Sequence, residues 1–461
     1  MDTPGTVTSA EAQLVRGLRL GDCVLLVVGS MIGSGIFLTT GQIADTLASP
    51  PLILLAWVLG GAMALCGAFT YAELGAMLPR AGGHYVYLRE AYGPLVGFLD
   101  GWLSFVASFP GSIAFVALGI TAHLPAAWSG TELAAFSLTG LTWTLRSGHV
   151  VAIGVILALS AINALGLRLG SGTQNLLTAL KIAVLAGVAG LGLALGRGQW
   201  ANLGVGADGW AGFSGMGAAL IGVSFAYLGW DAATYMAAEV NHPERTLPRS
   251  LALGTLLVVG IYLLFNVFVL YALPVTELAA AGNPAGKAIS RLISPSAGII
   301  LAPAILICIL GSLNATVMVG PRIYYAMARD GLFPASLGAV SPATRVPVNA
   351  IAAQAVWSCI IVLSATLGRI LAFTVLVIWV LSAVTAAAVF VLRRKCPEFP
   401  RPYSAWGYPW VPAAFCLTSL ALAANHLART PADALWLAGF LVAGLVVYTP
   451  FRRSSGITIG A

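Results

Sequence analysis

The sequence predicts an all-α membrane protein with twelve transmembrane helices, of which the first and the sixth are broken near the middle of the membrane. Three observations lead to this fold class. Hydrophobic residues make up 59% of the chain and charged residues only 8%, whereas soluble domains carry about 25% charged residues. Long apolar stretches recur along the whole chain. Glycine-rich or irregular segments interrupt two of these stretches, five spans apart.

The number of spans follows from the length of apolar sequence that a bilayer requires. A helix needs roughly 20 apolar residues to cross a hydrocarbon core about 30 Å thick. The apolar stretches and the polar segments between them predict spans at 21–46, 51–78, 93–122, 149–167, 173–195, 213–239, 250–272, 296–328, 349–367, 369–392, 408–427 and 433–450.

The first span contains the segment GSMIGSGIF at residues 29–37, with glycines at 29, 33 and 35. A glycine inside a helix costs about 1 kcal/mol relative to alanine, so three of them predict a break. Unwound backbone is tolerated in a membrane only where it lines a cavity or is buried in protein. The amides that begin the outer half-helix would suit a carboxylate, and the carbonyls that end the inner half-helix would suit an ammonium. The alternative is that these glycines only allow close helix packing.

Glu73, at the end of the second span, and Glu239, at the end of the sixth, lie within reach of loop arginines. We expect both to form structural or gating ion pairs.

Lys181 is the most informative ionisable residue within a span. With the fifth span beginning at 173, it would lie roughly 12 Å deep at about 1.5 Å per residue, too far to reach the headgroups comfortably. A buried ammonium needs acceptors, which predicts a functional role. The alternative is a side chain that stretches toward the cytoplasmic surface.

The sixth span contains the irregular segment FAYLGWD at residues 225–231. Because five is an odd number of spans, this segment enters the membrane from the side opposite to the first break. Matching breaks in opposite orientation indicate an inverted repeat with a substrate site near the midplane. Carbonyls near Phe225 and Ala226 could share the ammonium. Asp231 either caps the second half of this span or forms a site for a proton or a cationic substrate.

Charge and composition exclude other classes of protein. The net charge of +7 is explained by topology, because an N-terminus inside places most lysines and arginines in cytoplasmic loops. No nucleic-acid partner is needed, and both termini are expected in the cytoplasm. The five histidines and six cysteines form neither a metal cluster nor disulfide spacing, so we expect no metal, no cofactor and free thiols. A channel lacks a ring-like polar stripe, and an enzyme lacks a paired acid and base.

Several motifs resemble one known family. They are GSMIGSGIF, YAELGAMLPRAGGHYVYLREAYG from residue 71, Lys181, FAYLGWD followed by AAEVNHPERTLPRS, and RIYYAMARDGLFP from residue 322. Over about residues 17–450 the chain resembles the amino acid-polyamine-organocation superfamily, and within it the bacterial L-type amino acid transporters. This resemblance implies the five-plus-five inverted-repeat (LeuT-like) fold with two extra C-terminal helices. The units would be a cytoplasmic segment 1–20, repeats 21–195 and 213–392, added helices 408–450 and a cytoplasmic tail 451–461.

The same resemblance implies where the substrate binds. The expected contacts are Met31, Ile32, Gly33, Ser34 and Gly35 with Phe225, Ala226, Tyr227 and Gly229, flanked by Trp230. In sodium-coupled members of the fold a metal ion bridges the first and eighth spans. The resemblance suggests that the Lys181 ammonium stands in that place, with Ser312, Thr316 and the end of the inner half-helix as acceptors. Asp231 departs from the neutral residue of many relatives.

The expected function is sodium-independent transport of amino acids, neutral L-amino acids in particular, across the cytoplasmic membrane by alternating access, with obligatory exchange. Proton symport through Lys181, or transport of cationic amino acids or polyamines, stays open. No covalent step is expected. By the same resemblance, eukaryotic relatives carry a partner-binding cysteine in the loop between spans three and four. This chain has no cysteine there, so no disulfide-linked ancillary subunit is expected.

Overall fold

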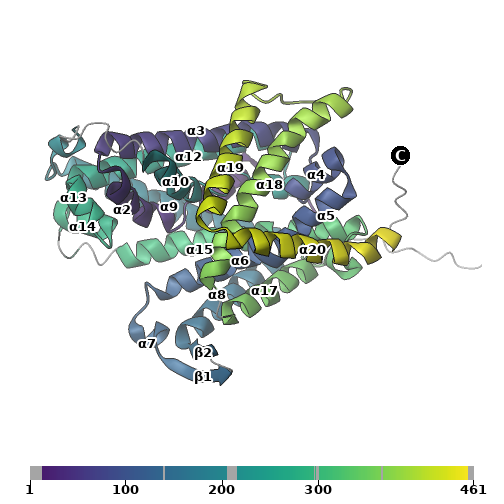
Figure 1. Ribbon diagram of the computed structural model, residues 1–461, viewed down its shortest axis with the longest axis horizontal. Helices are drawn as coiled ribbons and strands as arrows, with labels where there is room; N and C mark the ends of the chain where they lie inside the picture. Colours follow the sequence, from purple (N-terminus) through teal and green to yellow (C-terminus); the bar gives the residue numbers. More distant parts are fainter. Residues whose placement is uncertain are drawn as a thin grey trace, which may run out of the picture.

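The computed structural model describes residues 13–138, 141–204, 215–294, 296, 301–364 and 367–454, and it is a helical bundle (Figure 1). Within these residues nine helices are long and apolar enough to cross a membrane. They are α3 (Pro50–Met77), α5 with η1 and α6 (Pro94–Leu103, Ser104–Ser108, Phe109–Thr121), α8 (Ser147–Ala164), α9 (Leu167–Ala194), α12 (Pro243–Ala272), α15 with α16 (Leu301–Val319, Pro321–Arg329), α18 (Leu367–Lys395), α19 (Trp410–Arg429) and α20 (Ala432–Ser454). The chain is a multi-pass membrane protein.

Three shorter apolar helices complete the predicted set of hydrophobic segments. They are α1 (Leu20–Met31), α10 (Met216–Ala226) and α17 (Val348–Leu363). The total of twelve spans stays a prediction, and so does the division into two repeats. Parts of the predicted spans and termini lie outside the described residues, namely 1–12, 213–214, 297–300, 365–366 and 455–461.

Both predicted helix breaks are confirmed. The first separates α1, which ends at Met31, from α2 (Gly35–Leu47). The second separates α10, which ends at Ala226, from α11 (Ala232–Tyr235). Gly229 within the second break has φ +100°, a conformation that side chains disfavour and glycine allows.

The second half of the sixth span differs from the continuous helix to residue 239 that we expected. It consists of the four-residue α11 and a short 3₁₀ turn, η4 (Ala237–Glu239). Beyond η4 the chain forms a parallel bridge between Val240 and Leu18. Backbone groups that would continue a helix are used in that bridge.

The remaining elements lie in connections. The helices are α4 (His84–Tyr92), α7 (Ala126–Ser129), α13 (Val275–Ala279) and α14 (Pro284–Leu292), and the 3₁₀ turns are η2 (Trp200–Leu203) and η6 (Ala335–Gly338). An antiparallel hairpin of β1 (Glu132–Leu138) and β2 (Leu141–Arg146) stands in the loop after α6, with Glu132 opposite Arg146. These strands were not expected in a loop of an all-α protein, although the threonines and aromatic residues there favour them.

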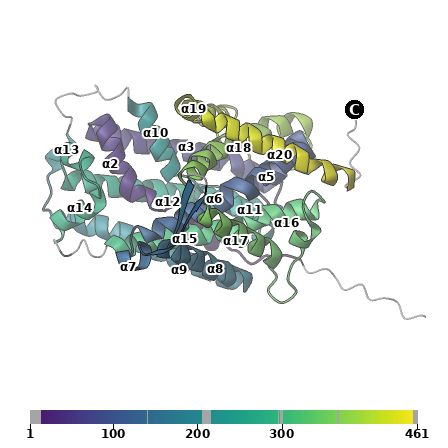
Figure 2. The same ribbon diagram turned by 60° about the horizontal axis from the view of Figure 1, so that its bottom comes forward.

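The broken helices lie inside the bundle. The half-helix α1 packs against α9, α12 and α15, while α2 packs against α10. In both views α2, α13 and α14 gather at one end of the long axis, and α4 or α16 marks the other (Figures 1 and 2). The two breaks therefore face each other between these ends.

Candidate functional site

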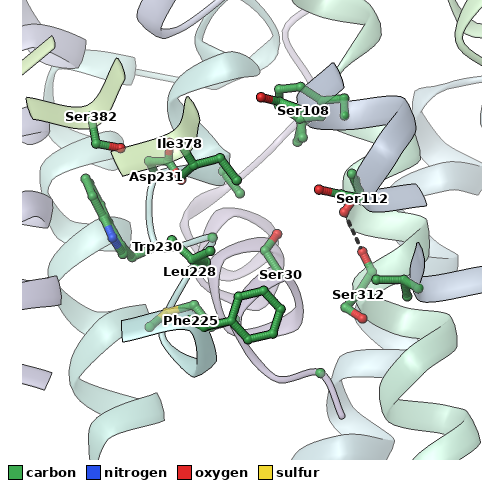
Figure 3. A pocket seen from close by; sticks show the side chains of 18 of the residues that line it. Ser30, Ser108, Ser112, Phe225, Leu228, Trp230, Asp231, Ser312, Ile378 and Ser382 are labelled. Carbon is green, nitrogen blue, oxygen red and sulfur yellow. Dashed lines mark hydrogen bonds between the residues drawn. The ribbon is translucent and has the colours of Figure 1, made fainter. Parts of the chain in front are cut away.

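A cavity of about 220 Å³ lies at the two breaks. It is smaller than the ~300–1,000 Å³ of pockets that hold drug-sized ligands, so it suits a small molecule. Figure 3 shows serine, aromatic and acidic side chains turned toward this space. Its lining includes the predicted residues Met31, Gly33, Ser34, Gly35, Phe225, Ala226, Gly229, Trp230, Asp231, Ser312 and Thr316.

Two of the expected contact residues do not line the cavity. The side chain of Ile32 is fully buried, and its carbonyl faces a lysine described below. The phenol of Tyr227 turns away and donates to the carbonyl of Trp57 at 3.1 Å. Both residues support the break from behind, and Leu228 takes a place in the lining.

Lys181 on α9 is wholly buried and reaches the first break. Its Nζ donates to the carbonyls of Gly29 and Ile32, both at 2.7 Å. A Cβ on Gly311 of α15 would lie 2.4 Å from its Cε, so this glycine makes room for the ammonium between α1 and α15.

Lys181 stands further from the start of its helix than expected, because α9 begins at Leu167 rather than 173. It is fourteen residues into the helix, or roughly 21 Å at about 1.5 Å per residue. Gly166, with φ +136°, provides the turn that starts α9 early.

The expected acceptors Ser312 and Thr316 do not bond Lys181. Ser312 Oγ donates to the carbonyl of Ile309 at 3.0 Å, and Thr316 Oγ1 donates to the carbonyl of Ser312 at 2.9 Å. Helical serines and threonines commonly bond back to their own preceding turn. Both residues line the cavity wall instead.

Tyr262 on α12 joins the two breaks, a role that no sequence motif indicated. Its hydroxyl lies 2.9 Å from the Met31 carbonyl and 3.0 Å from the Ala226 carbonyl. A phenol has one proton, so it donates to one of the two at a time. The last carbonyls of α1 and α10 thereby share one donor from an unbroken helix.

Of the two alternatives for Asp231, the helix cap is wrong. Its side chain caps no amide of α11. One oxygen, Oδ2, lies 2.8 Å from His84 Nε2 and accepts from the Tyr235 hydroxyl at 3.0 Å. The imidazole is stacked on Tyr235 at 5.3 Å between ring centroids and meets the edge of Tyr71 at 5.0 Å. The carboxylate of Asp231 therefore bonds His84, which is distant in sequence, and not the backbone amides at the start of α11.

A stripe of serines on the third span was also missed. Ser104, Ser108 and Ser112 all line the cavity, and Asp100 continues the same spacing of four. In a regular α-helix each such step drifts by about 40° around the axis. The π-helical turn η1 lies between these residues, and its wider turn reduces that drift. Polar residues four apart in an apolar span were a usable signal.

Ion pairs close the end of the bundle where α4 and α16 lie. Arg322 makes a bidentate pair with Glu239 through Nε at 2.8 Å and Nη2 at 2.9 Å. Arg393 pairs with Glu73 in the same way at 2.8 and 2.6 Å. The expected pairing of both glutamates with arginines is confirmed.

Tyr85 adds a hydrogen bond at the same end. Burial, together with the neighbouring carboxylate of Asp330, raises the pKa of its phenol. The hydroxyl therefore keeps its proton and donates to Asp330 at 2.8 Å.

Neither a metal centre nor a disulfide forms among the described residues. No group of three or more His, Cys, Asp or Glu side chains gathers there. The cysteines are free, and they are Cys23, Cys66, Cys308, Cys359, Cys396 and Cys416.

The chain is similar to known amino acid transporters along nearly its whole length. The model of the amino acid permease family matches residues 19–447. The serine/threonine exchanger SteT of Bacillus subtilis (strain 168) is 32% identical over 87% of this chain and 88% of its own length. The b(0,+)-type amino acid transporter 1 of Homo sapiens is 28% identical over 95% of this chain and 88% of its own. The human cystine/glutamate transporter is 26% identical over 91% of this chain and 82% of its own.

Proposed function

The chain belongs to the amino acid permease family and is a transporter of amino acids, not an enzyme; from this premise we propose that it is a sodium-independent exchanger of neutral L-amino acids. The substrate binds between the two breaks, and the carrier exposes it to one side of the membrane at a time. The fold proposed for this cycle is the LeuT-like inverted repeat, with both termini in the cytoplasm.

The observation that carries the proposal is the position of the Lys181 ammonium. It lies between α1 and α15 and donates to two carbonyls of the first break at 2.7 Å. The Lys181 ammonium supplies at this point the positive charge and the hydrogen-bond donors that a bound metal cation would otherwise give to those carbonyls. We therefore expect the first break to keep its shape without sodium.

Recognition of an α-amino acid follows from the two helix ends. The first amides of α2, at Gly35 and Ile36, have no acceptor within their own helix and lie at its positive end, which suits the substrate carboxylate. The last carbonyls of α10 suit the ammonium, because Tyr262 uses only part of the accepting capacity of Ala226.

The cavity wall favours a neutral side chain. Among the lining residues the ionisable acid and base are Asp231 and His84, and they bond each other at 2.8 Å. This pairing occupies the Asp231 carboxylate, which would otherwise be available to a cationic side chain. The hydroxyls of Ser104 and Ser108 on η1 and of Ser112 on α6 suit small side chains, in keeping with the name of the Bacillus subtilis exchanger.

The test is uptake of labelled amino acids into proteoliposomes that are either empty or preloaded. We expect uptake only into preloaded vesicles, with serine and threonine among the best substrates, and equal rates when sodium is replaced by choline. Uptake that rises strongly with sodium, or that proceeds equally well into empty vesicles, would refute the proposal.

A further inference from the structure

Asp100 on α5 is a buried carboxyl group without a partner. The residue is 1% exposed, and neither of its oxygens has a hydrogen-bond partner among the described residues. An ionised carboxylate in such a place costs several kcal/mol, and burial is tolerated when the group is neutral. With the end of the bundle near α4 and α16 held by ion pairs as seen here, Asp100 is therefore expected to carry a proton.

The surrounding charges do not provide Asp100 with a counterion. The groups that act on it are His84 on α4 and Asp231 at the second break, and the imidazole of His84 is already bonded to Asp231 at 2.8 Å. One imidazole thus faces two carboxylates and pairs with one. Two phenols, Tyr71 of α3 and Tyr235 of α11, also lie near and bring no positive charge.

The nearby arginines have other partners as well. Arg89 of α4 bonds Glu90 and Asp330. Arg322 of α16, which also packs on α5, is held by Glu239.

Asp100 stands at the end of the serine stripe that lines the cavity. It precedes Ser104 by one turn, and Ser104, Ser108 and Ser112 continue along the wall. Asp231, which Figure 3 shows beside the cavity, and His84 connect the same region to the second break. Asp100 therefore lies one helical turn beyond the cavity wall, near the substrate space but without a hydrogen bond to the serine hydroxyls.

We propose that Asp100 is a proton-binding residue of the transport cycle, so that the carrier changes sides readily only when this carboxyl is protonated. The inference rests on the proposed exchange function. One proton adds to the carboxylate from water when the bundle is open at this end, and it returns to water when that end opens again. Passage through the closed arrangement with an ionised Asp100 would require burial of an uncompensated charge. The proton stays bound to Asp100 during the inward and the outward step of an exchange cycle alike. The pH therefore changes the rate of exchange and not its direction.

The test is equilibrium exchange of labelled serine in proteoliposomes with equal pH on both sides, from about pH 5 to about pH 9. For wild type we expect a plateau at acid pH and a fall toward alkaline pH of up to about tenfold per pH unit, the slope of a single proton. Asp100→Asn imitates the protonated carboxyl. Its profile should be flat, and it should exceed wild type at the alkaline end, a gain that a misfolded protein cannot produce.

Two further variants complete the experiment. Asp100→Glu keeps a carboxyl group and should keep the alkaline fall. Asp433→Asn removes the acid of a second His–Asp pair, in which His426 Nε2 lies 2.8 Å from Asp433 Oδ2, and it should retain the wild-type profile because neither residue lines the cavity.

A flat wild-type profile, or an alkaline fall that persists in Asp100→Asn, would overturn the proton site while exchange itself stands. If Asp100→Asn fails to fold, Asp100→Ala, which also removes the titrating group, must give the flat profile. Absence of exchange for every amino acid at every pH would instead contradict the proposed function.

Discussion

Replacing Lys181 by methionine tests whether the buried ammonium holds the first break in its binding shape. Methionine keeps much of the length and apolar body of the side chain but donates no hydrogen bond. The two bonds to Gly29 and Ile32 at 2.7 Å are then lost. In exchange, the protein no longer buries an ammonium, which itself costs several kcal/mol.

The expected magnitude follows from the two carbonyls. Each buried carbonyl left without its donor costs about 1–3 kcal/mol, so together they disfavour the present shape of the break by about 2–6 kcal/mol. Since 1.36 kcal/mol is a factor of ten, the equilibrium constant between this shape and a relaxed one falls at least about thirtyfold. Overall stability falls less, because the relief of the buried charge offsets part of the loss.

We therefore expect Lys181→Met to fold and yet to exchange amino acids at least about thirtyfold more slowly than wild type. Equilibrium exchange in proteoliposomes measures the rate, and thermal unfolding in detergent measures the stability. Lys287→Met is the matched control, since its ammonium is exposed and pairs with Glu277 at 3.3 Å. Exchange by Lys181→Met within about threefold of wild type would contradict this account of the break.

Three other substitutions have defined outcomes. Tyr262→Phe removes the donor shared by the two breaks and should cost about 1–3 kcal/mol, seen as a lower melting temperature together with slower exchange; an unchanged melting temperature would contradict the shared donor. Glu239→Gln leaves Arg322 buried without its counterion and should destabilise the protein by about 3–5 kcal/mol, whereas the exposed Glu277→Gln should leave the melting temperature as it is. Gly229→Ala, at φ +100°, should strain the second break by at least about 1 kcal/mol and weaken substrate binding, so binding of wild-type strength would argue against a fixed backbone there.

Local sequence was enough to predict the apolar helices and the two breaks, although the total of twelve spans stays a prediction. Apolar length determines which segments can cross a membrane, and the glycines at 29, 33 and 35 weaken a helix wherever it stands in the fold. The break at Gly229 was predicted from the repetition of an irregular segment five spans later. These features depend on neighbours in the chain, which a single sequence displays directly.

The partners of individual polar groups could not be predicted in the same way. Asp231 has free amides close by in sequence, yet it bonds His84, which stands 147 positions away. In the sequence, Tyr262 is one of several aromatic residues in an apolar helix. Only the fold shows that its hydroxyl reaches both breaks. Ser312 and Thr316 were expected at Lys181 because of the family, but their own helix offers closer acceptors. Tertiary packing decided each case.

The contacts at the breaks are of two kinds. Some join helices of one packed group, and others join helices that separate in the proposed transport cycle. One set, α1, α3, α10 and α12, forms a packed group, and α6, α8, α15 and α17 form another, while α9 touches members of both and α1 packs directly on α15. Tyr262 joins members of the first group, so its bonds can persist while the groups move. The pair of Arg322 on α16 with Glu239 beyond α11 joins the two sides at one end of the bundle. In the proposed alternating-access cycle, that end opens only when this buried pair separates into water, where each charge is solvated again. Because a buried pair gains little over two hydrated charges, it can hold one end closed without making the closed arrangement too stable to leave.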